Sequence, residues 1–73
     1  MNYQLTITNQ QNDKKTLELR TNDFEFAKKV FFKLGQNLIK AGFDIKFPYV
    51  KNAHVFIAMS IEKSVIAKLT EEK

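Results

Sequence analysis

Apolar residues recur every three or four positions between residues 22 and 42, which is the spacing of one face of an α-helix. The recurring residues are Ala27, Val30, Phe31, Leu34, Leu38 and Ala41, with Phe24 at the edge of the stripe. This pattern predicts one long helix over about residues 22–41, with its apolar stripe turned toward a core.

Both ends of this segment carry helix boundary signals. Asn22 is placed to cap the N-terminus, and Glu25 follows at the three-residue spacing of a capping box. Gly42 is placed to adopt a left-handed conformation after the last turn, so that Phe43 contacts Leu38 in a Schellman ending.

Polar and apolar residues alternate in two segments before the helix, residues 3–8 and 15–21, and alternation of this kind indicates half-buried strands. Alignment of their apolar faces predicts a hairpin with one register. The expected cross-strand pairs are Ile7–Leu17, Leu5–Leu19, Thr8–Thr16, Thr6–Glu18 and Gln4–Arg20.

Two more strands are expected after the helix, at residues 43–47 and 53–60, with Pro48 ending the first. The second is apolar on both faces. We assign Val55, Ile57 and Met59 to the core face, and His54, Phe56, Ala58 and Ser60 to the outer face. The matching register pairs Ile45 with Val55, Phe43 with Ile57, Asp44 with Phe56 and Lys46 with His54.

The tail, from Ser60 onward, is expected to form a short helix, because Ile61, Val65 and Leu69 are four residues apart. A fifth strand over residues 65–69 is the alternative. Residues 1–73 are therefore expected to form a single α+β domain of order β-β-α-β-β-α, in which antiparallel hairpins form a sheet packed on the long helix.

Charge and composition narrow the classes of partner. The 73 residues carry 12 Lys and Arg against 8 Asp and Glu, a net charge of +4, and Arg20 is the only arginine. This balance favours acidic partners, while the shortage of arginine argues against specific nucleic-acid readout. There is no cysteine and no apolar run of membrane-spanning length, and the N-terminus lacks signal-peptide features, so we expect a cytoplasmic protein without a membrane partner.

No motif indicates catalysis. His54 is the only histidine; Asp44 could lie near it, but Ser60 is about 20 Å of strand away. Gly35 and Gly42 are the only glycines, so there is no phosphate-binding loop. We therefore expect no enzyme activity, no catalytic residue, no cofactor and no metal site.

Two residues lie off the main helical stripe, Phe32 and Ile39, with Gly35 between them and the core face. One interpretation is that Gly35 lets a strand or the tail approach closely and cover both side chains. The other is that they form a second stripe that docks a partner, beside lysines on the outer side. The partner-binding residues are then expected to be Lys29, Phe32, Lys33, Gln36, Ile39 and Lys40.

The function that this pattern favours is a small non-enzymatic protein-binding module. Small size and a Lys-, Asn- and Ile-rich composition are typical of phage and mobile-element accessory proteins, several of which inhibit or regulate larger nucleic-acid-handling defence proteins by occupying a surface. The expected partner surface is acidic or nucleic-acid-binding. The sequence does not decide whether the chain also forms a homodimer through its sheet edges or helices.

The alternative is a DNA- or RNA-binding domain that uses the helix lysines. A sheet platform for single strands needs exposed aromatic rings. Only Phe56 is expected to supply one, because the other aromatic strand residues are expected to point inward; these are Tyr3, Phe43 and Phe47.

Overall fold

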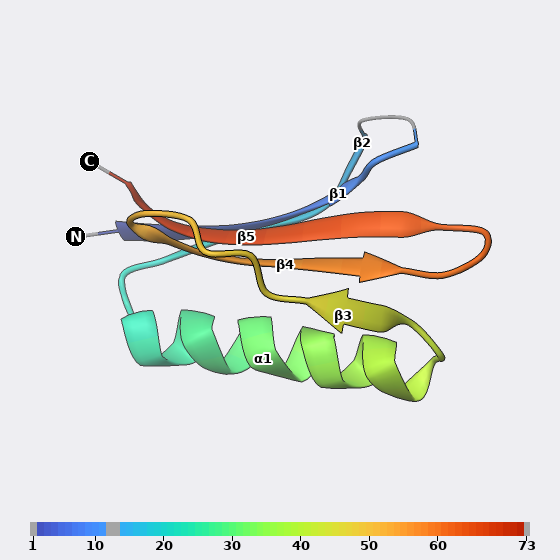
Figure 1. The fold of residues 1–73 in the computed structure, drawn as a ribbon. Coiled ribbons are helices and arrows are strands. Elements are labelled where there is room, and N and C mark those ends of the chain that lie inside the picture. The colour runs from blue at the N-terminus through green and yellow to red at the C-terminus, as the bar shows by residue number, and fades with distance from the viewer. Residues whose placement is uncertain (1, 12–13, 73) are drawn as a thin grey trace.

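The computed structural model describes residues 2–11 and 14–72, which form one five-stranded antiparallel sheet with one helix packed on a single face (Figure 1). The strand order is β2-β1-β5-β4-β3. The elements are β1 (Asn2–Asn9), β2 (Lys14–Thr21), α1 (Phe24–Lys40), β3 (Asp44–Lys46), β4 (Ala53–Met59) and β5 (Ser64–Glu72).

The C-terminal segment is a strand, so the expected terminal helix is wrong and the order is β-β-α-β-β-β. β5 occupies the centre of the sheet between β1 and β4. Val65 and Leu69, four residues apart, also lie on one face of a strand, because every second side chain points the same way. Their spacing is thus compatible with both structures, and burial of Ala67 and Leu69 in the middle of the sheet favours the strand.

The core lies between α1 and the face of the sheet that α1 covers. The sheet contributes side chains from its three central strands, and the helix contributes Ala27 and Phe31. All of these side chains are at most 9% exposed. The buried sheet residues are Leu5 and Ile7 on β1, Phe56 and Ala58 on β4, and Ala67 and Leu69 on β5.

The face of β4 that packs against the helix is opposite to the one expected. Phe56 and Ala58 face the helix and are fully buried, so Val55, Ile57 and Met59 lie on the other face. Ile45 pairs with Ala58 and not with Val55, a shift of three residues. An odd shift moves every side chain of a strand to the other face of its sheet.

The first hairpin forms with most of the expected register. Ile7 pairs with Leu17, and the three expected pairs beyond it are also observed. The expected pair of Thr8 with Thr16 is wrong: an irregularity after Ile7 brings Thr8 opposite Lys15. A bulge of this kind places one extra residue on one strand and locally strengthens its twist.

The helix starts one residue later than the capping box predicts. Asp23, and not Asn22, is the N-cap, and its side chain accepts a hydrogen bond from the Phe26 N–H at 3.1 Å. Thr21 Oγ1 in turn accepts the Asp23 N–H at 3.1 Å. The carboxylate therefore satisfies one of the free amides of the first turn and places negative charge at the positive end of the helix.

The C-terminal end of the helix is confirmed. Gly42 has φ +94°, and its N–H donates to the Ile39 carbonyl at 3.0 Å. The Phe43 N–H donates to the Leu38 carbonyl at 3.0 Å, which completes the Schellman motif. Ala41 is the C-cap and is exposed, so it does not belong to the buried stripe.

Candidate protein-interaction surface

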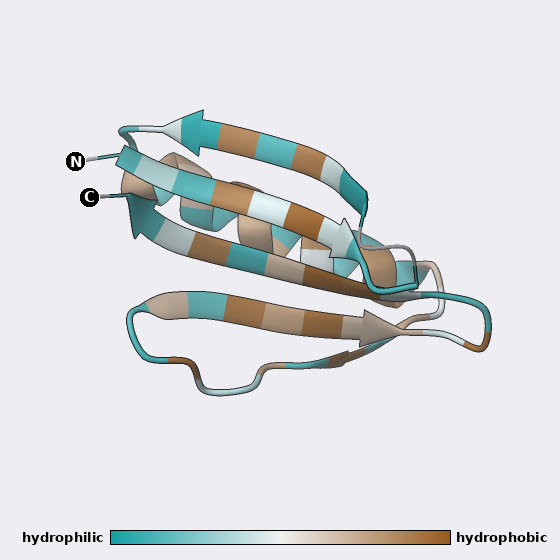
Figure 2. Cartoon of the chain, turned by 90° about the horizontal axis from the view of Figure 1, so that it is seen from above, coloured by the Kyte–Doolittle hydropathy of each residue, from teal (hydrophilic) through white to brown (hydrophobic). Residues whose placement is uncertain are grey.

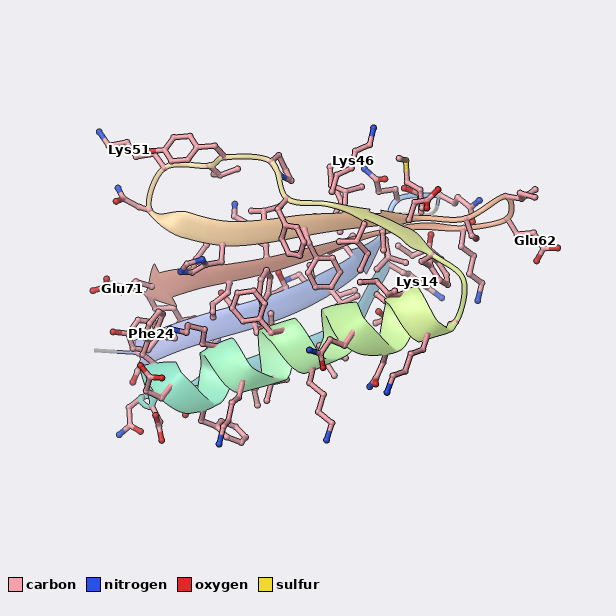
Figure 3. All side chains as sticks on the ribbon, turned by 60° about the horizontal axis from the view of Figure 1, so that its bottom comes forward. Lys14, Phe24, Lys46, Lys51, Glu62 and Glu71 are labelled. Atoms are coloured by element: carbon pink, nitrogen blue, oxygen red, sulfur yellow. The ribbon has the colours of Figure 1, made fainter. Side chains whose placement is uncertain are left out.

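The six expected partner-binding residues lie together on the outer side of α1, and all are exposed. We call them the helix surface: Lys29, Phe32, Lys33, Gln36, Ile39 and Lys40. Figure 3 looks onto this side of the molecule. Phe32 and Ile39 are 45% and 56% exposed, so the interpretation that a strand or the tail covers them is wrong. The other part of that interpretation is confirmed, because Gly35 is buried against Phe56 of β4.

Phe32 is held in place although it is exposed. Its ring meets the buried ring of Phe31 edge-on, with 5.2 Å between centroids. The outer edge of the Phe32 ring remains accessible. A partly anchored aromatic ring loses little conformational entropy on binding, which favours it as a contact residue.

The lysines of the helix surface are not neutralised by ion pairs with described residues. Lys29, Lys33 and Lys40 form no ion pair with any residue that the structure describes, including Glu25, which lies one turn before Lys29. Since an exposed charge of this kind is screened within about 10 Å at moderate salt, it acts mainly on a partner that comes close. The helix surface therefore combines local positive charge with accessible apolar area.

An irregularity between β3 and β4 creates a second exposed feature beside α1. β3 pairs with β4 as far as Lys46, and Val50 then bridges Ala53 in the same register. Midway between these pairs, Pro48 falls opposite Val55, but proline has no N–H for the ladder. The chain leaves β4 at this point and returns at Val50, as the bowed connection in Figure 2 shows.

The bowed connection exposes two aromatic rings: Phe47 is 59% exposed and Tyr49 is 91% exposed. A groove runs between the connection and α1, and we call it the aromatic groove. Phe32 lines both this groove and a second depression over the helix. The groove residues include Phe31, Phe32, Phe47, Pro48, Tyr49 and Val50.

The aromatic groove was missed from the sequence. Phe56 was expected to be the exposed ring on the sheet, but it is fully buried. Phe47 was expected to point inward; its ring does lie against that of Phe56, with 6.2 Å between centroids, but the residue stays 59% exposed. Pro48 was the available signal. It indicated where β3 ends, but not that pairing with β4 resumes at Val50 or that the rings of Phe47 and Tyr49 between the two pairs are left exposed.

The residues considered for catalysis are separated. Asp44 pairs with Met59, five residues and about 16 Å along β4 from His54, and on the opposite face of the sheet. The expected proximity of Asp44 to His54 is therefore wrong. The His54 ring lies instead toward the helix, with its centroid 6.0 Å from that of Phe24 and 6.2 Å from that of Phe31. Over residues 2–11 and 14–72, no three His, Asp or Glu side chains gather as a metal site.

Comparisons with protein-family models, with curated proteins and with solved structures found no match. Within the described part of the chain, the single helix is too short and too polar to cross a membrane. The assignment of a function therefore depends on the geometry and charge of the surfaces described above.

Proposed function

We propose that this chain is a non-enzymatic protein-binding module whose helix surface docks on an acidic surface of a larger protein. The observation that carries the proposal is the exposure of Phe32 and Ile39 after all described elements have packed. Both lie beside Lys29, Lys33 and Lys40, which have no internal ion pair among the described residues.

The apolar part of the helix surface supplies binding energy. Burying apolar surface contributes about 25 cal/mol per Å², and a large aromatic ring that enters a pocket often dominates an interface. Phe32 is placed for this role, because it stands at the junction of the aromatic groove and the depression over the helix. Phe47 and Tyr49 extend the same contact region.

The positive charge of the lysines determines which charge the partner surface carries. A surface that binds nucleic acid is itself basic and would repel them, so an acidic surface fits better. If the partner is a nucleic-acid-handling defence protein, as the composition typical of phage and mobile-element proteins suggests, this chain would inhibit or regulate it from an acidic region.

A second candidate function is binding of single-stranded DNA or RNA. Exposure of Phe47 and Tyr49 favours it, because bases stack on such rings while lysines follow the phosphates. Arg20 gives no support: it lies away from α1 and is paired with Glu72 at 3.2 Å and with Glu18 at 3.4 Å. The apolar side chain of Ile39 also has no role in stacking.

A pull-down from a lysate of cells that carry this protein, run with and without nuclease, separates the two functions. Protein binding predicts a captured protein that stays after nuclease treatment. Nucleic-acid binding predicts capture that nuclease removes, together with oligonucleotide affinity that falls steeply with salt. Replacement of Lys29, Lys33 and Lys40 by Gln should abolish most of that oligonucleotide binding, and an unchanged triple variant would reject the second candidate.

A further inference from the structure

The sheet has a face that no described element covers. α1 packs on one side only, and Figure 2 views the sheet from the other side. Because strand side chains alternate, the open face carries the residues that the core does not use. Its apolar part is a strip on two neighbouring strands, in which Ile57 and Ile66 pair directly. We call it the open-face strip: Val55, Ile57 and Met59 on β4, and Ile66 on β5.

The charges of the open face nearly cancel, although the whole chain carries +4. Strand pairing places four basic and three acidic side chains on this face, a net charge of +1. One of the basic groups, Arg20, is already bound to two of the acids. A second copy therefore meets less net repulsion at this face than at the lysine-rich helix surface. The residues are Lys15, Arg20, Lys46 and Lys68 against Glu18, Asp44 and Glu72.

Other surfaces suit a second copy less well. The edge strand β3 has three residues and is followed by Pro48, which blocks continued pairing. The other edge, β2, carries charged side chains along its length, including Lys15 and Glu18. Two helix surfaces would bring Lys29, Lys33 and their counterparts together without compensating acids. Dimerisation through edges or helices, which the sequence left open, is thus disfavoured by short or charged edges and by like charges.

The area of the open face is enough for a small interface. The four long strands are about 4.8 Å apart and about 25 Å long, so they cover about 480 Å², and the three residues of β3 add about 50 Å². Two copies would therefore bury about 1,060 Å² of planar area in total, just above the roughly 1,000 Å² that a specific interface needs. The apolar strip is bordered by polar side chains such as Thr6 and Thr70, in the usual pattern of an apolar centre and a polar rim.

We infer that the open face is the interface of a homodimer, in which two sheets pack face to face and the open-face strips meet. Two-fold symmetry places each strip against its own copy, and aligned sheets pack about 10 Å apart with interdigitated side chains. This dimer leaves the helix surface of each copy exposed for a different partner. The inference is therefore independent of the proposed function.

Sedimentation equilibrium over a wide range of concentration tests this inference. The parent should dimerise, and the double variant Ile57→Thr/Ile66→Thr should raise the dimer dissociation constant by about a hundredfold or more, because each interface loses four buried apolar side chains. Threonine keeps the β-branched shape that strands favour, so the fold should be retained. The matched control is Ile39→Thr on the helix surface, which should leave the dissociation constant unchanged.

A dilution series of the parent, followed by isoleucine methyl NMR, gives a result that needs no folded variant. Methyl signals of Ile57 and Ile66 should shift on dilution, whereas those of Ile39 and Ile61, which are exposed elsewhere, should not. A parent that stays monomeric at every concentration would overturn the inference. A dimer whose dilution shifts appear at Ile39 and not at Ile57 would also overturn it.

Discussion

The ring of Phe56 packs against the bare backbone of Gly35: a Cβ added at Gly35 would lie 3.6 Å from Cε2 of Phe56. The absent side chain in the middle of α1 gives room to the largest residue of β4, which is fully buried. The buried Phe56 ring thus contacts the helix at Gly35, whereas its neighbours Val55 and Ile57 lie on the open face.

The distance of 3.6 Å is an ordinary van der Waals contact, so alanine should fit at position 35. Gly35→Ala should stabilise the protein by about 0.5–1 kcal/mol, because it removes the cost of glycine in a helix interior. Gly42→Ala should do the opposite: nothing lies within 4 Å of that site, but its φ of +94° penalises any side chain. Urea unfolding measures both changes.

A larger residue at the same helix position gives a further check. Gly35→Leu should destabilise by about 1–3 kcal/mol, because the added atoms collide with Phe56. If Gly35→Ala were destabilising to the same extent as Gly35→Leu, the contact between the helix and β4 would be tighter than described.

The N-cap of α1 can be tested with neighbouring residues. Asp23→Ala should cost about 1 kcal/mol of stability, since the Phe26 N–H loses its acceptor. Asn22→Ala should change stability by less than about 0.5 kcal/mol, because Asn22 is exposed and does not cap the helix. Thermal unfolding of the two variants compares them directly, and a larger loss for Asn22→Ala would restore the capping box as the helix start.

Pro48 keeps the edge of β4 unpaired at Val55. The Ala53 N–H donates toward Val50, so the Val55 N–H, two residues on, points to the same side. Pro48→Thr supplies an N–H that donates to the Val55 carbonyl, in a register that already exists on both sides. With the chain drawn back to β4 at this point, the Val55 N–H donates in turn to the carbonyl of residue 48. Hydrogen exchange of the Val55 amide should slow by about fivefold, as expected for one added hydrogen bond of about 1 kcal/mol.

The amide of Ile57 serves as the internal reference, because its residue already pairs with Lys46. Unchanged exchange at Val55 in the Pro48→Thr variant would show that the bowed connection has another cause than proline.

Local signals predicted the parts of the fold that are decided locally. The first hairpin follows from one apolar face on each strand, and Ile7 pairs with Leu17 as expected. The Schellman ending follows from Gly42, since few residues other than glycine adopt its conformation without cost. Both features depend on residues that are close in sequence.

The predictions were wrong where the sequence pattern is compatible with two structures. β4 is apolar on both faces, so its pattern does not decide which face turns inward; in the structure Phe56 turns inward and contacts Gly35. The spacing of Val65 and Leu69 suits a helix or a strand, and only the central place of β5 in the sheet decides between them. The helix surface was predicted from the sequence. The aromatic groove was not, because it depends on where the connection around Pro48 leaves β4 and returns to it.

The affinity between this chain and a protein captured from nuclease-treated lysate, compared with that of the double variant Phe32→Ser/Ile39→Ser, tests the proposed function most directly. Both side chains are exposed, so their replacement should leave the fold intact. The account predicts at least about tenfold weaker binding by this variant, since two apolar contacts are lost. The control Ile61→Ser, at a fully exposed position outside the helix surface, should bind as the parent does. Equal affinity of the parent and the Phe32→Ser/Ile39→Ser variant would contradict the account.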